Sequence, residues 1–544
     1  MNHSTGYKGY AMRFPMVARY PSRRSPVLAD NVVSTSHPLA TQAGISMLKQ
    51  GGNAIDAALG AAIALTILEP TGNGIGSDGF AIVWDGSALH GLNASGCSPA
   101  GWSPEYFSNP KRKVDRRRGW DSITVPGAVA GWVELSKRFG RLPFCKLFDP
   151  AIDYAENGFL VSPVIAALWK DQAEILKTQP GFEKTFLIKG RSPAAGDRFF
   201  NLEAGQSLAL IAKSEGEAFY KGQLAEKIVS EAKAHGAVLS FDDLAENSPH
   251  WCGTIQKPFD NFVLHEIPPN GQGIAACMVL GILQNTPIRE LEPESPQALH
   301  LMWEAMKLAF ADIESYVADP IYMKKVSVSA LLNDYYLAQR ASLIDPERAK
   351  NFGAGKPGGG GTVYLCAADA QGNMISYIQS NYEGFGSGVV VPGTGIHLQN
   401  RGAGFNLCSG HPNEVGPRKK PFHTIIPGFL TKANVPQMAF GVMGGGMQAQ
   451  GHIQMVLRTQ IWDQDVQTAV DAPRWRILGG MLVACEAEMP SVSLQVLAKY
   501  GHDIKVEAPD AVFGFGGAQI IHRLARGGYA AGSDPRKDGC AAGF

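Results

Sequence analysis

A threonine that directly follows a run of glycines is the residue of this sequence best placed to do chemistry. Thr362 comes after four glycines, residues 358–361, and begins an alternating, β-branched stretch. Within a chain its hydroxyl is an ordinary alcohol. At a new N-terminus the residue gains an α-amine with a pKa of about 7.7–8.0, close to neutral pH and within reach of its own Oγ1. A cut between Gly361 and Thr362 would therefore give one residue both a nucleophile and a base.

The residues after Thr362 predict a β-hairpin. Two alternating runs flank a Gln-Gly-Asn turn centred near Gln371. That register places Cys366 opposite Ser376, and Thr362 opposite Ser380, so we expect the Ser380 hydroxyl to orient the hydroxyl of Thr362. The alternative reading is that the glycine run is only a surface loop that enters a strand.

A second glycine run predicts an anion-binding turn. Gly444, Gly445 and Gly446 stand between a predicted strand and a helix predicted over 448–463. Backbone N–H groups at the start of a helix can point into a cleft and stabilise a developing negative charge. Loss of one donor from such an oxyanion site typically costs about 3 kcal/mol. Tight packing of a strand against a helix would explain these glycines equally well.

The composition is that of a globular protein with no electrostatic bias. The 544 residues are 45% hydrophobic and 18% charged, and Lys+Arg and Asp+Glu balance at 49 each. This balance gives no reason to expect nucleic acid or an anionic membrane as a partner. The longest apolar stretch, 57–68, is too short to span a bilayer, and the first thirty residues contain no signal-peptide pattern. We therefore expect a cytoplasmic protein.

No motif in the sequence predicts a metal or a cofactor. The eight cysteines are widely spaced, without a CxxC pair or a histidine at zinc spacing. The run GAGKPGGGGT lacks the Ser or Thr that must follow Lys356 in a phosphate loop. We expect neither a cofactor nor a metal site.

Predicted helices dominate the first 350 residues and predicted strands follow residue 360. Ser36 is the expected N-cap of one helix and Asn53 that of the next. Further helices are predicted over 126–139, 144–157, 206–213, 224–235 and 296–317, and again over 448–463 and 466–472. This distribution indicates antiparallel sheets covered by helices.

Several segments together carry a family resemblance. In chain order they are GGNAIDAALGAAIALTILEPTGNGIGSDGFAIVWDG, SITVPGAVAGW, the Gly-Thr junction, NRGAGFNL, MGGG, DAPRW and GSDPRKDG. From about residue 28 to the C-terminus the chain resembles the γ-glutamyltranspeptidase family. The resemblance implies an N-terminal-nucleophile hydrolase with an αββα four-layer sandwich. It also implies self-cleavage into a larger chain, 1–361, and a smaller one, 362–544, which stay intertwined as one globular unit.

The catalytic positions of the family match this sequence. The resemblance implies that Thr362 is the nucleophile, that Ser380 supports it, and that Gly444 and Gly445 form the oxyanion pair.

The positions that hold the substrate differ from the family pattern. Pro104 stands where the γ-glutamyl-binding arginine is expected, and Tyr382 replaces an asparagine. Gly404 replaces the aspartate that holds the α-amino group, and Arg401 replaces a glutamine. His423 and Thr424 replace the paired serines that hold a carboxylate.

These differences predict amide cleavage with an acyl group other than γ-glutamyl. A glutamyl head needs an anion for its ammonium group, and none is evident, whereas Arg401 can hold a carboxylate alone. We assign substrate binding to Arg401, Tyr382, His423 and Thr424; the alternative for Arg401 is to tie down a loop. We expect hydrolysis of a small amide, with transfer to an amine acceptor as the other fate.

Four other functions stay open. They are true γ-glutamyl transfer or glutathione hydrolysis, an oxamate-type amidohydrolase, a cephalosporin-type amidohydrolase, and a family member without catalysis. The sequence also leaves open a homodimer of the cleaved heterodimer.

Overall fold

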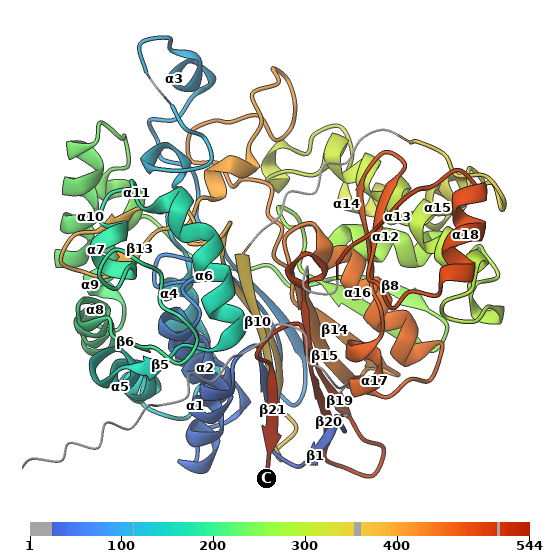
Figure 1. Cartoon of the computed structure of the whole chain (residues 1–544), viewed down its shortest axis with the longest axis horizontal. Helices are drawn as coiled ribbons and strands as arrows, with labels where there is room; N and C mark the ends of the chain where they lie inside the picture. The colour runs from blue at the N-terminus through green and yellow to red at the C-terminus, as the bar shows by residue number, and fades with distance from the viewer. Residues whose placement is uncertain (1–23, 113, 353–360, 509–511) are drawn as a thin grey trace, which may run out of the picture.

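Two antiparallel β-sheets face each other at the centre of the molecule (Figure 1). The computed structural model describes residues 24–112, 114–352, 361–508 and 512–544. In these residues each sheet has seven strands. The first sheet has the order β1 (Val27–Ala29), β20 (Tyr529–Ser533), β19 (Gly517–Arg523), β15 (Val435–Met443), β14 (Gly428–Lys432), β9 (Phe262–Glu266) and β8 (Ile255–Phe259).

The second sheet carries the predicted hairpin at its centre. Its order is β21 (Cys540–Gly543), β2 (Val32–Thr35), β10 (Gly361–Ala368), β11 (Met374–Tyr382), β3 (Asp78–Trp84), β4 (Leu89–Ala94) and β7 (His250–Trp251). The hairpin strands β10 and β11 therefore have neighbours on both sides.

The side chains of β10 alternate between two hydrophobic cores, one on each face of the sheet. Tyr364 and Cys366 lie in the apolar layer between the sheets, together with Phe80 and Phe429. The residues that alternate with them, such as Leu365, face the opposite way and join the core beneath the helices. Successive side chains of a strand point to opposite faces, so a strand buried on both faces is apolar throughout.

Helices from the first part of the chain cover the second sheet, on the left of Figure 1. They include α1 (Pro38–Lys49), α2 (Ala54–Leu68), α4 (Ala128–Phe139), α5 (Asp149–Asn157), α6 (Pro163–Leu176), α8 (Leu202–Lys213) and α10 (Gln223–Ala234). Every residue of α2 is buried, as expected of a helix that is apolar on all sides. Asn53 and Asp56 form a capping box at its start.

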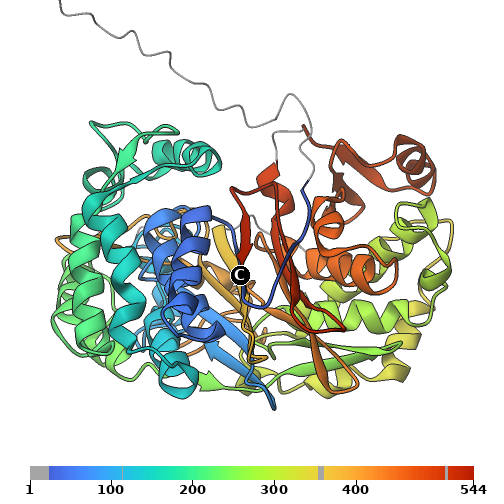
Figure 2. The same ribbon diagram turned by 90° about the horizontal axis from the view of Figure 1, so that it is seen from below.

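Helices from the middle and end of the chain cover the first sheet, and Figure 2 shows the same layers from below. They are α12 (Gly273–Leu283), α13 (Pro296–Tyr316), α15 (Asp334–Ala341), α16 (Met447–Gln460), α17 (Val466–Asp471) and α18 (Ser491–Lys499). The layers therefore follow the order helix, sheet, sheet, helix, which confirms the predicted αββα sandwich.

Short elements complete the described parts of the chain. The strands are β5 (Phe159–Leu160), β6 (Arg198–Phe199), β12 (Val390–Val391), β13 (Ile396–His397), β16 (Trp475–Gly479), β17 (Leu482–Cys485) and β18 (Asp503–Val506). The helices are α3 (Pro104–Ser108), α7 (Phe182–Phe186), α9 (Glu217–Tyr220), α11 (Phe241–Ala245) and α14 (Val328–Leu331). Among the residues with a described position, no helix is both long and apolar enough to cross a bilayer.

The predicted hairpin register is confirmed. Cys366 pairs with Ser376 and Val363 with Gln379, and the hydroxyls of Thr362 and Ser380 are in contact, as this register implies; a β-bulge next to Thr362 shifts Gly361 to Tyr382. The glycine-rich segment 353–360 lies outside the described residues. The expected N-cap Ser36 was wrong by one residue, because Nδ1 of His37 accepts the hydrogen bond from N of Leu39 and caps the helix instead.

A buried histidine should make stability depend on pH. His397 is buried, its Nε2 lies 2.9 Å from O of Asn73, and burial lowers its pKa from 6.5 to about 4. Between those values the unfolded chain binds the proton and the folded chain does not. As the pH falls from 6.5 to 4, this histidine should therefore lower the free energy of unfolding by about 1.4 kcal/mol per pH unit.

His397→Gln tests this dependence because glutamine can still donate to the same carbonyl oxygen but cannot titrate. We expect the variant to be less stable than wild type at pH 6.5 and the difference to shrink at pH 4.5. Chemical denaturation at both pH values measures it. A constant difference would contradict the assigned direction of the pKa shift.

Candidate active site

Two hydroxyl groups meet at the open end of the central hairpin. Oγ1 of Thr362, at the start of β10, lies 3.0 Å from Oγ of Ser380 on β11, and both residues are fully buried. The loop at Gly72 packs on the other side. A Cβ atom at Gly72 would lie 3.1 Å from the carbonyl oxygen of Thr362, so a larger residue would have to push this strand end aside by a few tenths of an ångström.

The Ser380 hydroxyl is held by two donors besides its contact with Thr362. It accepts hydrogen bonds from N of Tyr382 at 2.8 Å and from Nη2 of Arg401 at 2.7 Å. Arg401 is therefore separated from Oγ1 of Thr362 by no more than two hydrogen bonds in series. The arrangement places a positive charge directly beside the two hydroxyls.

Arg401 is a buried cation that forms no direct ion pair within the described residues. Its side chain is 1% exposed, its Nη1 donates to Oγ1 of Thr424 at 2.8 Å, and its guanidinium lies 4.6 Å from the ring centre of Tyr382. The neighbouring carboxylates have other partners: Asp78 pairs with His423, and Glu383 with Arg117 and Arg118. In the described part of the chain, Arg401 forms no ion pair with a carboxylate.

Burial lowers the pKa of Arg401 to about 10, and the nearby negative charge of Asp78 opposes this shift. The guanidinium therefore stays charged at neutral pH. A buried charge without an ion-pair partner is costly. Its Nε atom also has no hydrogen-bond partner among the residues that the structure describes. Such a group is suited to bind an anion.

Tyr382 adopts a backbone conformation that is uncommon for a large residue. Its φ angle is +78°, in the left-handed region. This conformation puts the tyrosine ring over the guanidinium of Arg401, where a cation–π contact stabilises the charge. Uncommon backbone conformations of this kind concentrate at functional sites.

His423 lies behind the site and not on its surface. Its Nε2 donates to Oδ2 of Asp78 at 3.1 Å, and its Nδ1 accepts a long hydrogen bond from N of Ile425. Burial and the charge of Arg401 hold the pKa of His423 well below its usual value, and burial raises the pKa of Asp78 to about 6. This position differs from the expectation that His423 contacts substrate, because the side chain is fully buried and its Nε2 is bonded to Asp78.

The predicted glycine turn lies directly after β15. Gly444 and Gly445 have φ angles of +135° and +61°. Their carbonyl oxygens accept hydrogen bonds from N of Met447 and N of Gln448 in the first turn of α16. Because each peptide unit is planar and trans, the N–H groups of Gly445 and Gly446 point the opposite way, away from the helix. N–H groups that point away from a helix in this way can serve as donors to an oxyanion.

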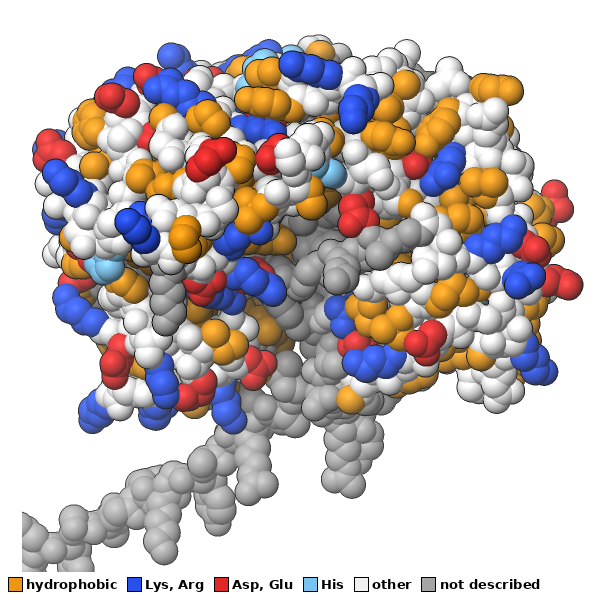
Figure 3. Space-filling model, turned by 90° about the horizontal axis from the view of Figure 1, so that it is seen from above, with side chains coloured by type: hydrophobic (Ala, Val, Ile, Leu, Met, Phe, Trp, Pro, Cys, Tyr) orange, Lys and Arg blue, Asp and Glu red, His pale blue; other side chains and the backbone are white. Residues whose placement is uncertain are grey.

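A cleft of about 420 Å³ lies beside these residues. Tyr382, Gly404, Thr424 and Gly446 line it. The lining also includes Phe310, Ile313 and Glu314 of α13, Val317 directly after this helix, Phe422, and the polar residues Asn406, His411 and Asn413. None of the cleft residues belongs to α3, which contains Pro104. Figure 3 shows that positive and negative side chains are interspersed on the upper face of the molecule.

Two residues of the site were not found from sequence. Asp78 holds His423, and Gln272 lines the cleft and donates to the carbonyl oxygen of Gly445. Asp78 lies within the GSDG segment, so a carboxylate inside a glycine-rich motif was a usable signal. Gln272 follows a Pro-Pro-Asn-Gly turn and gave no comparable signal.

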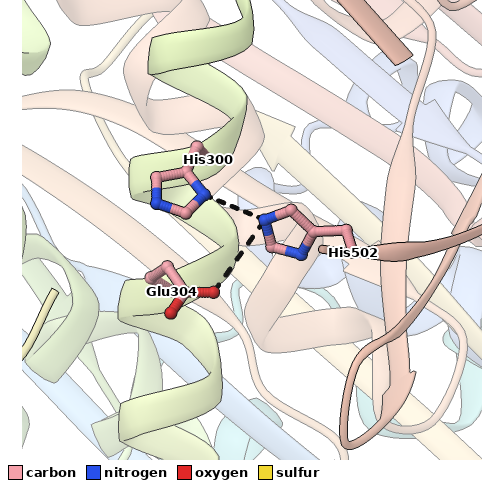
Figure 4. Close-up of side chains that lie close together, drawn as sticks. All are labelled: His300, Glu304 and His502. Carbon is pink, nitrogen blue, oxygen red and sulfur yellow. Dashed lines mark hydrogen bonds and ion pairs between the residues drawn. The ribbon is translucent and has the colours of Figure 1, made fainter. Parts of the chain in front are cut away.

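One cluster of potential metal ligands occurs among the residues with a described position. His300 and Glu304, one turn apart on α13, face His502, and Nδ1 of His300 lies 2.9 Å from Nε2 of His502 (Figure 4). The ammonium group of Lys307 contacts Oε1 of Glu304. A metal ion would have to displace this buried cation from its partner, so the cluster fits a metal poorly.

The same cluster has a structural use. Oε2 of Glu304 accepts from N of Lys350 at 3.1 Å, and Nζ of Lys307 donates to O of Lys350 at 2.6 Å. His300 reaches O of Asp345 at 2.7 Å. The cluster thus anchors the chain just before the glycine-rich segment.

Comparison with known proteins agrees with this architecture. The sequence model of the family described as gamma-glutamyltranspeptidase matches residues 40–544. The chain belongs to the γ-glutamyltranspeptidase family. It is thereby a member of the N-terminal-nucleophile hydrolase superfamily.

Similar family members have different names. The chain is 33% identical over 536 residues to the glutathione hydrolase-like YwrD proenzyme of Bacillus subtilis, covering 96% of this chain and 100% of that protein. It is 33% identical over 534 residues to the oxamate amidohydrolase proenzyme of Klebsiella pneumoniae, covering 96% and 99%. The crystal structure of a cephalosporin acylase from Bacillus halodurans has a TM-score of 0.93 and 44% identity, covering 98% of this chain and 99% of that one.

Ser380→Ala tests whether the hydroxyl pair matters for chemistry. We expect self-cleavage to slow on the order of tenfold or more, because Thr362 loses the group that orients its hydroxyl. Ser376→Ala is the matched control. Ser376 is equally buried on the same strand, and its Oγ bonds to the hydroxyl of Tyr364 at 2.8 Å.

Each variant should lose about 1 kcal/mol of stability from its missing hydrogen bonds. A time course of intact mass measures cleavage, and thermal unfolding measures stability. Equal slowing in both variants would assign Ser380 a merely structural role.

Proposed function

We propose that this family member is a self-processing amidohydrolase. The chain cuts itself between Gly361 and Thr362, and the new chains 1–361 and 362–544 remain together. The contact between the hydroxyls of Thr362 and Ser380 supports this proposal. The names of two relatives, both proenzymes, also support it.

In the proposed reaction the freed α-amine of Thr362 takes the proton from Oγ1, which attacks the amide carbonyl carbon. The N–H groups of Gly445 and Gly446, in the turn that begins at Gly444, stabilise the negative oxygen of the tetrahedral intermediate. The C–N bond then breaks, and the ammonium proton passes to the leaving amine. Water, activated by the same α-amine, hydrolyses the ester on Thr362 and releases the acid.

The unpaired charge of Arg401 is the observation that carries the choice of substrate. We propose that it binds a carboxylate on the acyl group. The guanidinium is buried, lies beside Ser380, and has no ion-pair partner among residues whose positions the structure gives. Thr424 and Tyr382 hold it in place and complete the acyl-binding site. Substrates are therefore half-amides of dicarboxylic acids.

The size of the cleft favours substrates whose acyl group or amine is larger than that of oxamate. A volume of about 420 Å³ falls in the usual range of roughly 300–1,000 Å³ for small-molecule sites. Phe310, Ile313 and Val317 make one wall apolar. A side-chain amide of the kind cleaved by cephalosporin acylases is thus favoured over a molecule as small as oxamate.

Transfer of a γ-glutamyl group fits the site less well. Gly404 lines the cleft where the family has an aspartate, and a Cβ atom there would lie 2.6 Å from O of Phe422. The site therefore offers no carboxylate at that position for a substrate ammonium group. Hydrolysis is the proposed main fate, and the cytoplasmic location and the homodimer stay predictions.

Self-cleavage has a direct test. Purified wild-type protein should show two masses, for chains that end at 361 and begin at 362, whereas Thr362→Ala should show one uncleaved, inactive chain. N-terminal sequencing of the smaller chain should begin Thr-Val-Tyr. A wild-type chain that stays intact after long incubation would contradict the proposed mechanism. A cleaved chain that turns over no amide would favour a non-catalytic role.

Arg401→Gln tests the carboxylate site. The probes are the mono-p-nitroanilide of glutaric acid and the same compound with its free carboxylate converted to a carboxamide. Wild type should prefer the carboxylate in kcat/KM by about 30-fold, which is about 2 kcal/mol for a charged hydrogen bond. The variant should lose most of that preference.

The ratio of kcat/KM between the two probes separates two roles of Arg401. If Arg401 only supports Ser380, its loss lowers kcat/KM for both probes equally; if it recognises the carboxylate, the ratio itself falls. An unchanged ratio in Arg401→Gln would mean that Arg401 ties down a loop instead. Robust turnover of γ-glutamyl-p-nitroanilide with stimulation by glycylglycine would favour γ-glutamyl transfer.

A further inference from the structure

Gln272 lies where the two halves of the proposed site meet. It is the N-cap residue of α12, is 2% exposed, and lines the cleft. Gln272 precedes the expected cut, whereas Thr424 and Gly445 follow it. Any contact of Gln272 with either of the other two therefore crosses from the larger proposed chain to the smaller one.

The side-chain amide of Gln272 uses its Nε2 group for two backbone carbonyls. It donates to O of Gly445 at 2.8 Å and also to O of Thr424. A primary amide has two N–H donors, so both are engaged. The backbone N of Gln272 donates to O of His423 at 2.9 Å as well. Gln272 thus ties the segment that carries Thr424 to the glycine turn.

The glycine turn needs an external support of this kind. Gly444 and Gly445 have positive φ angles and no side chains, so little in the turn itself restricts rotation of their peptide units. The carbonyl of Gly445 also accepts from N of Gln448, but at 3.2 Å. Because a peptide unit is rigid, fixing this oxygen restricts the ψ angle of Gly445 and the direction of the adjacent N–H groups. Donors to an oxyanion act best when they are oriented before the reaction.

We propose that Gln272 is a positioning residue for amide hydrolysis. It orients the Gly444–Gly445 turn relative to Thr424, so that the oxyanion donors and the acyl-binding residues keep one fixed geometry. The inference rests on the proposed function of this site. It assigns a role in the chemistry to a residue of the chain that does not carry the nucleophile.

Gln272→Glu is the main test. The substitution keeps size and shape, removes both donors, and places a carboxylate oxygen against two carbonyl oxygens. With the mono-p-nitroanilide of glutaric acid as probe, we expect kcat to fall at least tenfold while KM stays within about twofold. The reason is that oriented oxyanion donors act mainly in the transition state.

Gln454→Glu is the matched control. Gln454 is also 2% exposed, and its Nε2 also donates to two backbone carbonyls, those of Gln450 and Trp475, at 3.2 and 3.1 Å. The same chemical change there should lower stability to a similar extent and leave kcat near the wild-type value. Gln272→Met is the second variant, because it removes the donors without adding a charge, and it should also lower kcat.

The outcomes separate the two levels of the proposal. A cleaved, active wild type together with a folded Gln272→Glu or Gln272→Met of unchanged kcat overturns the positioning role alone. An equal fall of kcat in Gln454→Glu also overturns it, because the effect is then one of general stability. A wild-type protein that is neither cleaved nor active contradicts the proposed function, and the positioning role of Gln272 falls with it.

Discussion

The pairing of β10 with β11 is the interaction on which the whole site depends. A shift of one residue between these strands would turn the side chain of Thr362 to the opposite face of the sheet. Two features fix the register. Oδ1 of Asp369 accepts hydrogen bonds from N of Gln371 and N of Asn373 at the turn. At the same time β2 and β3 pair with the outer edges of the hairpin. The hydroxyl contact at the far end follows from this register.

Electrostatics form the second constraint. The positive charge of Arg401 is balanced mainly by the negative charge of Asp78, with which it forms no direct ion pair. The carboxylate oxygens of Asp78 accept hydrogen bonds from His423 and from N of Gly96 and Gly127 instead. The positive charge is therefore tolerated in the folded chain without a direct ion pair. Under the proposed function, a direct ion pair would have occupied the guanidinium group that we assign to a substrate carboxylate.

Local patterns allowed the hairpin and the cap of α2 to be predicted from sequence. The alternation of β10 and β11, the Gln-Gly-Asn turn and the Asn53 cap involve residues close together in the chain. The pair of Asp78 and His423 was not predictable in this way, because 345 positions separate the two residues. Only the order of strands in the sheets brings them together.

His423 shows a second limit of sequence reasoning. It stands next to Thr424, and both were expected to contact substrate. In an extended segment adjacent side chains point to opposite sides, so Thr424 faces Arg401 while His423 faces Asp78. The sequence alone does not tell which of the two neighbours faces the cleft. The bond from Gln272 to Gly445 also joins distant segments.

Each sheet contains strands from both sides of the Gly361–Thr362 junction. The first sheet combines β1, β8 and β9 with β14, β15, β19 and β20. The second combines β2, β3, β4 and β7 with β10, β11 and β21. If the proposed cut is made, neither product can leave without breaking hydrogen-bond ladders in both sheets. Separation of the two polypeptides would then require both sheets to unfold, so chains from different molecules would not exchange.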